Sequence, residues 1–264
     1  MEIMKCNYDG EMISYKKEGT GAAVVFVHGF GEDSKIWRKQ EGTFNNFCCI
    51  YIDLPGSGDS PFNQKLSDIL DYAKAVNAVL ENEKIDHCIL IGHSMGGYIA
   101  LAFAQLFADK LLALCLFHSS AFADSEEKIK NRKKSIEFVT ANGAAKYFKT
   151  IIPDLFFDNE KSANLIQEQL AIAALTSDAA VVQYLQAMID RQDTTSVLKI
   201  LGVPVGFILG EYDKAVPFTP GLEQSHLADV TYLHVLRQTA HMGMLEETSI
   251  VREILGEFLI SCSK

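Results

Sequence analysis

One short stretch near the middle of the chain constrains the fold more than any other. Residues 92–97 read Gly-His-Ser-Met-Gly-Gly, directly after the apolar run 87–91 and before the helix-forming run 98–104. A strand that turns at once into a helix brings the chain close to itself, and glycine leaves the room that this requires. The stretch therefore predicts a sharp strand-to-helix turn that exposes the Ser94 hydroxyl.

Such a turn suits a nucleophile. A strained backbone would present the serine oxygen, and the N–H groups at the start of the helix would stabilise a developing negative charge. The five-residue pattern also occurs in ordinary surface turns, because glycine and serine are common. The rest of the chain therefore has to supply the catalytic partners.

Apolar runs alternate with helical patterns along most of the chain. The runs predict strands over residues 11–17, 22–27, 47–52, 87–91, 111–117, 203–210 and 231–236. Apolar residues at helical spacing predict helices over 69–80 and 250–262. This alternation predicts an α/β fold with a mainly parallel central sheet and helices on both faces, its active site at the carboxyl ends of the strands.

The pattern changes between residues 122 and 189, where apolar residues recur at helical spacing and no strand-like run occurs. We predict a helical lid insertion over 122–189, within a core formed by residues 1–121 and 190–264. Ordinary peripheral helices are the alternative to a lid. The densest basic run, residues 132–134, falls here and is expected on a solvated helix face.

Composition narrows the possible partners. The net charge of −10 disfavours nucleic acid and anionic membranes, since both require clustered lysine and arginine. The N-terminus lacks a signal pattern, and no apolar stretch is long enough for a membrane span. We therefore expect a soluble, cytoplasmic protein that acts on a small-molecule substrate. The oligomeric state stays open.

Neither the cysteines nor the histidines indicate a metal site. The six cysteines include no C-x-x-C pair, and several fall in apolar runs, which favours reduced core residues over disulfides or zinc ligands. His87, His226 and His234 do not cluster with carboxylates or cysteines in the sequence. We expect no metal and no cofactor.

The second half of the chain supplies what a serine nucleophile needs, a base and a carboxylate that orients the base. Asp213 follows the strand 203–210, and His241 follows the strand 231–236. Both therefore lie on the edge of the sheet that carries Ser94, in the chain order Ser, Asp, His. Glu211 is the nearest rival of Asp213, and we favour Asp213.

Five stretches resemble the α/β-hydrolases that carry a helical lid, a group that includes carboxylesterases, enol-lactonases and C–C bond hydrolases. They are residues 28–31 (His-Gly-Phe-Gly), 53–58, 92–97, 210–213 and 240–242. The resemblance implies Ser94 as nucleophile, His241 as general base and then acid, and Asp213 as its orienting carboxylate. It implies an oxyanion hole made by the backbone N–H groups of Phe30 and Met95.

The same resemblance narrows the reaction. Relatives that open epoxides or displace halide use aspartate as the nucleophile, so Ser94 argues against both reactions. We expect a serine hydrolase that cleaves carboxylic esters or lactones of small to medium apolar acyl groups through an acyl-enzyme. Five phenylalanines are expected to line its pocket: Phe30, Phe122, Phe148, Phe156 and Phe157.

Two other functions stay open. One is a C–C bond hydrolase or lyase of the same fold, for which the basic residues Arg132, Lys133 and Lys134 are the only hint, because such enzymes bind substrate carboxylates. The other is a ligand receptor with slow turnover, since a fold does not fix a function. His118, at the end of strand 111–117, is a candidate substrate contact, with local hydrogen bonding as the alternative.

Overall fold

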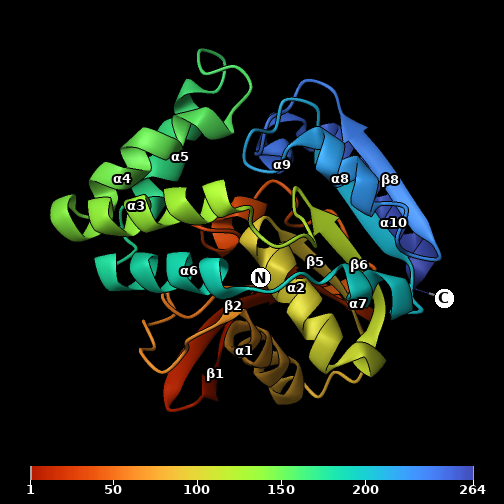
Figure 1. The fold of residues 1–264 in the computed structure, drawn as a ribbon. Helices are drawn as coiled ribbons and strands as arrows, with labels where there is room; N and C mark the ends of the chain where they lie inside the picture. Colours follow the sequence, from red (N-terminus) through yellow and green to blue (C-terminus); the bar gives the residue numbers. More distant parts are fainter. Residues whose placement is uncertain (1, 264) are drawn as a thin grey trace.

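An eight-stranded sheet forms the centre of the computed structural model, which describes residues 2–263 (Figure 1). The strands lie in the order β1-β2-β4-β3-β5-β6-β7-β8. Their bounds are β1 Glu2–Tyr8, β2 Glu11–Glu18, β3 Ala22–Val27, β4 Phe47–Ile52, β5 Cys88–His93, β6 Leu111–Phe117, β7 Val205–Gly210 and β8 Thr231–Leu236. Strands β3 to β8 run parallel to one another, whereas β2 pairs antiparallel with β4 and β1 pairs antiparallel with β2. The predicted fold class is confirmed.

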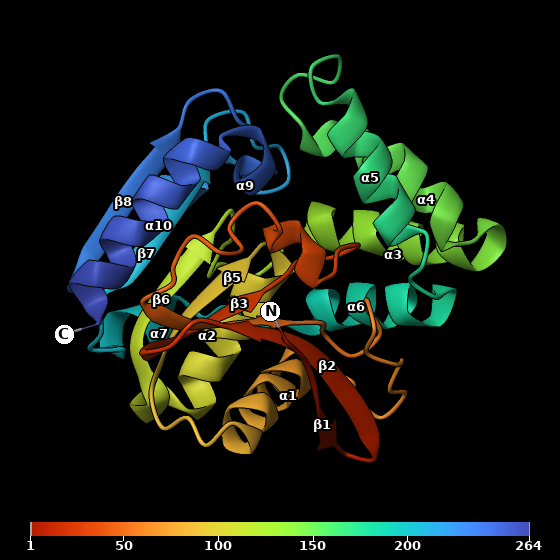
Figure 2. The same ribbon diagram turned by 180° about the vertical axis from the view of Figure 1, so that it is seen from behind.

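Helices cover both faces of the sheet. On one face lie α1 (Ile69–Asn82), α2 (Met95–Leu106) and α7 (Thr195–Ile200), and α10 (Thr248–Cys262) lies on the other (Figures 1 and 2). Every residue of β5 and β7 is buried, as expected of parallel strands that are covered on both sides. The remaining short elements are η1 Ser34–Trp37, η2 Ala108–Lys110, α8 Phe218–Gln224 and α9 Gly243–Glu246.

Strand β1 lies outside the predicted strands. It forms a hairpin with β2, in which Tyr8 pairs with Glu11 and leaves Asp9 and Gly10 as a two-residue turn. Both turn residues have positive φ, 52° and 93°, as a type I′ turn requires. Only Cys6 of β1 is buried, so its hydrophobic pattern is weak. The Asp-Gly pair is the sequence signal that identifies this hairpin.

The insertion between β6 and β7 is helical, as predicted. Its elements are α3 Glu126–Asn142, α4 Ala144–Ile151, η3 Pro153–Leu155, α5 Ala163–Ala173 and α6 Asp178–Asp190. They stand together at the carboxyl-terminal edge of the sheet, opposite α8 and α9 (Figures 1 and 2). Ser125 and Ser177 cap α3 and α6, because each side chain accepts a hydrogen bond from an N–H of the first turn. The role of this insertion as a lid and its exact limits in the sequence stay predictions.

Among residues 2–263, no single helix is both long enough and apolar enough to cross a membrane. Helices α5 and α6 reach that length and apolarity only when taken together, and the chain bends by 101° at the break between them.

The strand order determines where a site forms. Strand β3 has β4 on one side and β5 on the other, so the chain connections diverge at this point of the sheet. Ligands of open parallel sheets bind at such a point, outside the carboxyl ends of the strands. Val27 pairs with Gly92 at those ends. The loop after β3 and the turn after β5 therefore lie side by side.

Candidate active site

Ser94 sits at the turn between β5 and α2 with φ 52° and ψ −117°. A positive φ is strained for a residue with a side chain, and such strain persists only where the surroundings enforce it. The Ser94 N–H donates to the carbonyl of Phe117 in the neighbouring strand (2.9 Å), and the Ser94 carbonyl accepts the Ser119 hydroxyl (2.7 Å). These two bonds fix the strained peptide units on both sides of the serine.

The two glycines of the turn are required by close backbone contacts. A Cβ atom on Gly92 would lie 2.3 Å from the carbonyl oxygen of Gly96. A Cβ atom on Gly96 would lie 2.4 Å from the carbonyl oxygen of Val27 in β3. The spacing in the sequence therefore follows from the approach of α2 to β5 and β3.

Asp213 and His241 meet at the same edge of the sheet. His241 Nδ1 lies 2.7 Å from Asp213 Oδ2, and both side chains are buried. The other Asp213 oxygen accepts the N–H groups of Ala215 and Val216, at 2.8 Å each. Burial would raise the pKa of Asp213, but His241 and the other partners hold it well below its ordinary value. Glu211 is exposed, so Asp213 is the carboxylate beside the histidine.

One cavity of about 210 Å³ brings Ser94 and His241 together. Phe30, on the loop after β3, also lines it. Met95 is the first residue of α2, where backbone N–H groups have no partner within the helix. The structure thus gathers the five predicted site residues at one edge of the sheet. Phe30, Ser94 and His241 line the cavity, whereas Asp213 and Met95 lie behind its wall. The catalytic roles of all five stay predictions.

The expected phenylalanine lining is partly wrong. Phe30 and Phe148 line the cavity that contains Ser94. Phe156 and Phe157, in the segment between η3 and α5, line a second surface depression, and Phe122, before α3, lines a third. The cavity wall is instead completed by aliphatic residues of the insertion, which are Ile151, Ile152, Leu155 and Met188.

His118 does not line the cavity. Its buried Nδ1 lies 3.2 Å from Asp213 Oδ2, although the geometry is poor for a hydrogen bond. Burial lowers the pKa of His118 to about 4, so the ring is neutral at neutral pH. Glycines make room for the ring, since a Cβ atom on Gly210 or Gly243 would lie 2.8 or 2.6 Å from it. His118 packs behind Asp213 rather than against a substrate.

A metal ion is one use that this cluster could have. The ligand atoms of His118, Asp213 and His241 lie within 4.8 Å of one another. The 2.7 Å separation of His241 Nδ1 and Asp213 Oδ2 is, however, that of a direct hydrogen bond. The pair is therefore hydrogen-bonded directly, and the absence of a metal stays a prediction.

A buried ion pair that the sequence did not indicate connects three loops of the site. Glu32 Oε2 accepts the Gly29 N–H at 2.6 Å and His93 Nδ1 at 2.9 Å. His93 Nε2 donates to the carbonyl of His241 at 3.0 Å. Both ring nitrogens thus face acceptors, so both carry protons and His93 is a cation.

The pKa values of the pair agree with this charge state. Burial would raise the pKa of Glu32, but His93 holds it below its ordinary value. Burial would likewise lower the pKa of His93, but Glu32 holds it above its ordinary value. The pair therefore stays ionised inside the protein.

Comparison with known proteins agrees with this geometry. The family model described as "Alpha/beta hydrolase family" matches residues 24–253. The chain belongs to the alpha/beta hydrolase family. The structure of this hydrolase superposes on an esterase from Thermogutta terrifontis with a TM-score of 0.93, at 24% identity and with 100% of both chains covered.

Two further proteins are similar to this chain, one in structure and one in sequence. The enol-lactonase from Burkholderia xenovorans LB400 superposes with a TM-score of 0.90 at 19% identity, covering 97% of this chain and 100% of the other. A 2-succinyl-6-hydroxy-2,4-cyclohexadiene-1-carboxylate synthase from Klebsiella pneumoniae is 24% identical over 90% of this chain and 94% of its own. The structural likenesses establish the fold, and the substrate of this hydrolase stays open.

Replacing Glu32 by glutamine should destabilise the hydrolase in a pH-dependent manner. The pKa of Glu32 is lowered in the folded protein, so its contribution to stability is present above pH 4.5 and is lost as the pH falls further. The pKa of His93 is raised in the folded protein, so its contribution is present below pH 6.5 and is lost as the pH rises past that raised pKa. Between these limits Glu32→Gln should lower the free energy of unfolding by about 3–5 kcal/mol. Urea unfolding across pH measures this, with the exposed Glu253→Gln as control. An equal loss at every pH would contradict the ion pair.

Alanine at two glycines should have opposite effects on stability. Gly96→Ala forces a Cβ atom into the Val27 carbonyl and should lower the unfolding free energy by about 1–3 kcal/mol or more. Gly256 lies within helix α10, and a Cβ atom there would be 3.9 Å from the nearest atom, in Phe44. Gly256→Ala should therefore raise the unfolding free energy by about 0.5–1 kcal/mol. Thermal denaturation compares the two. A Gly96→Ala protein as stable as the wild type would contradict the close contact.

Proposed function

We propose that this hydrolase cleaves carboxylic esters or lactones of small to medium apolar acyl groups, with Ser94 as the nucleophile. The observation that supports this most strongly is that Ser94 and His241 line one cavity while His241 Nδ1 lies 2.7 Å from Asp213. A serine, a histidine and a buried carboxylate in this order form a nucleophile, its base and the group that orients the base.

The proton positions follow from the hydrogen bonds. Asp213 is an acceptor, so His241 carries its proton on Nδ1 and leaves Nε2 free to take the proton of Ser94. The serine oxygen then attacks the substrate carbonyl, and the backbone N–H groups of Phe30 and Met95 stabilise the oxyanion. His241 returns its proton to the leaving alcohol, and water activated by the same histidine releases the acyl group.

The size and lining of the cavity favour a small acyl group. Its volume of about 210 Å³ is below the range of roughly 300–1,000 Å³ that is typical of pockets for drug-sized ligands. Phe148 and the aliphatic side chains of α4 and α6 form much of the wall. The esterase and the enol-lactonase to which the fold is similar agree with this substrate class.

C–C bond cleavage or a lyase reaction is the second candidate. Arg132 and Lys128 line the same cavity as Ser94, where they would bind the carboxylates of such a substrate. The relative from Klebsiella pneumoniae is named as a synthase of a carboxylate. Ester hydrolysis remains our first proposal because it needs only the serine, the base and the oxyanion donors.

Ser94→Ala should reduce the hydrolysis of p-nitrophenyl esters by about a thousandfold or more, because the nucleophile is lost. A series from acetate to octanoate, followed by released p-nitrophenol, should show the highest kcat/KM at short chain length. Ser57→Ala is the matched control, since Ser57 also lies between glycines but bonds to Tyr184 outside the cavity. Equal activity of Ser94→Ala and wild type would reject the proposal, and inactivity of both would favour the C–C bond reaction or a slow-turnover receptor.

Asp213→Asn should lower kcat by about three to four orders of magnitude, because an amide no longer holds His241 in the required tautomer. Glu211→Gln should change kcat by less than about twofold, since Glu211 is exposed. Steady-state kinetics with the best ester of the series compares the two variants. A large loss in Glu211→Gln with an active Asp213→Asn would assign the carboxylate to Glu211 instead.

A further inference from the structure

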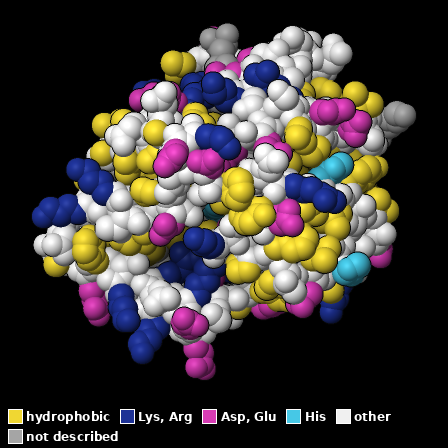
Figure 3. Space-filling view, turned by 90° about the horizontal axis from the view of Figure 1, so that it is seen from above, with side chains coloured by type: hydrophobic (Ala, Val, Ile, Leu, Met, Phe, Trp, Pro, Cys, Tyr) yellow, Lys and Arg dark blue, Asp and Glu magenta, His cyan; other side chains and the backbone are white. Residues whose placement is uncertain are grey.

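Two basic side chains of α3 face the cavity of Ser94 and His241. Lys128 and Arg132, four residues apart on one helix face, both line it. Their neighbours in the basic run, Lys133 and Lys134, are exposed and lie outside it. Figure 3 shows Lys and Arg side chains in the hollow near the middle of this face of the molecule. The positive charge at the cavity thus comes from particular positions of the helix.

The charges around these two residues do not balance. Asp124 accepts Arg132 Nε at 2.5 Å and Arg191 Nη2 at 2.9 Å, and Lys128 Nζ lies 3.7 Å away. No other carboxylate within residues 2–263 pairs with any of the three cations. The three cations therefore share one carboxylate, which leaves a net charge of about +2 beside the cavity. The side chains of Lys128 and Arg132 are partly exposed, so an anionic ligand in the cavity can reach them and neutralise this charge.

Unused donors point to the same conclusion. Arg132 donates through Nε, and its two Nη groups make no hydrogen bond within the described part of the chain. Lys128 Nζ donates to the carbonyl of Ala215 at 3.1 Å and has further N–H groups available. A guanidinium fork and an ammonium on one wall suit a carboxylate, because the fork binds its two oxygens in parallel.

Tyr98 also lines the cavity and lies in the positive potential of these cations. Burial would raise the pKa of its hydroxyl, but the charges of Lys128, Arg191 and Arg132 hold it below its ordinary value. Arg191 lies 3.8 Å above the Tyr98 ring and is thereby held in place behind the wall.

We propose that Arg132 and Lys128 bind a free carboxylate of the substrate, so that the substrate is an ester or lactone that carries a second, ionised carboxyl group. Asp124 and Arg191 act as positioning residues for this subsite. The proposal rests on the proposed function for the bond that is cleaved. It adds a charged end, in the acyl part or in the leaving group, to a substrate whose remainder is apolar.

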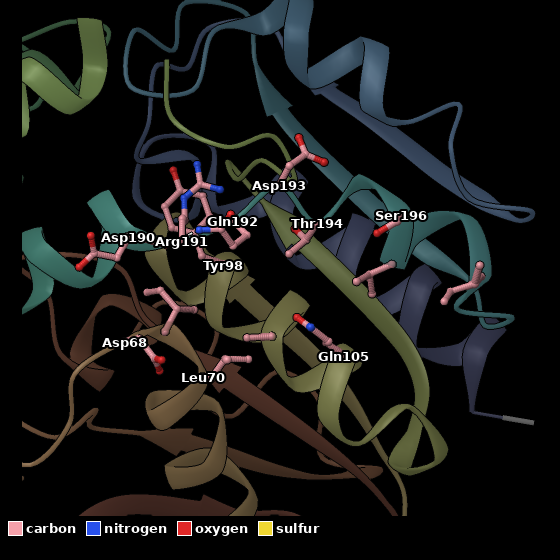
Figure 4. Close-up of a pocket in the computed structure, with 14 residues that line it drawn as sticks. Asp68, Leu70, Tyr98, Gln105, Asp190, Arg191, Gln192, Asp193, Thr194 and Ser196 are labelled. Carbon is pink, nitrogen blue, oxygen red and sulfur yellow. Dashed lines mark hydrogen bonds between the residues drawn. The ribbon is translucent and has the colours of Figure 1, made fainter. Parts of the chain in front are cut away.

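A second, larger cavity of about 510 Å³ is a weaker candidate for the anion. Tyr98 lines it as well, and Arg191 and Gln192 lie along its wall beside Asp190 (Figure 4). It contains neither Ser94 nor His241, and three carboxylates line it, those of Asp68, Asp190 and Asp193. These negative charges oppose an anion. The carboxylate subsite therefore belongs to the cavity that holds the serine.

The kinetic test compares esters that differ in charge and little else. Monomethyl glutarate is compared with its neutral amide, methyl 4-carbamoylbutanoate, and acetoxyacetate with acetoxyacetamide, so that the carboxylate lies in the acyl part or in the leaving group. In one of these two pairs, whichever places the carboxylate at the subsite, the wild type should have a higher kcat/KM for the charged ester than for the neutral one. Arg132→Gln and Lys128→Gln should lower the charged-to-neutral ratio of kcat/KM by about 10- to 100-fold, the value of a charge-assisted hydrogen bond. Arg132→Lys should restore part of it.

Lys133→Gln is the matched control, because it removes the same charge one residue along the helix and should leave the ratio unchanged. Asp124 keeps Arg191 as a partner in Arg132→Gln, so the variant should fold, as circular dichroism can verify. No charge preference in the wild type, or equal losses for charged and neutral esters in Arg132→Gln, would overturn the subsite and leave Arg132 as a structural residue.

A binding measurement separates this inference from the proposed function. Calorimetry with Ser94→Ala should detect binding of glutarate, and an additional Arg132→Gln should weaken that binding about 10- to 100-fold. The neutral glutaramide should bind Ser94→Ala and the double variant with equal affinity. This result would support the carboxylate subsite even if no ester were hydrolysed. Undetectable glutarate binding together with hydrolysis of only neutral esters would reject the subsite and retain the esterase.

Discussion

The ion pair between Glu32 and His93 is the interaction on which the site depends. Through Gly29 it holds the loop after β3, through His93 the turn after β5, and through the His241 carbonyl the loop after β8. Each loop supplies a different part of the proposed chemistry, and the sheet alone fixes only where the strands end. The pair therefore converts three neighbouring loops into one rigid arrangement, at the cost of burying two charges.

The parts of the site that the sequence predicts are those that local backbone geometry dictates. The spacing of Gly92 and Gly96 around Ser94 reflects carbonyl oxygens closer than 2.5 Å to any added Cβ atom, so few other residues fit. Glu211, two residues from Asp213, is expected to point elsewhere at the strand end, so the sequence favours Asp213, and the structure places Asp213 beside His241. Strand alternation likewise encodes the sheet, because burial on both faces demands continuous apolar runs.

Glu32 and Lys128 were not predicted, because their importance depends on contacts between distant segments. Glu32 meets His93 across 61 residues of chain, and no periodicity marks such a partner. The direction in which α3 faces decides that Lys128 and Arg132 line the cavity while Lys133 and Lys134 do not. The same reason explains why only Phe30 and Phe148 of the five expected phenylalanines reach it.

The insertion leaves the sheet after β6 and returns before β7, so the cavity has walls of two origins. The strand ends carry Ser94, Asp213 and His241, whereas α3, α4 and α6 carry most of the side chains that would touch the remainder of a substrate. The two walls touch at His241, because the Leu155 carbonyl of the insertion accepts the His241 N–H at 2.9 Å. Substitutions in the helices that keep this contact can therefore reshape the wall around the substrate and leave the bond-breaking groups where the strand ends hold them.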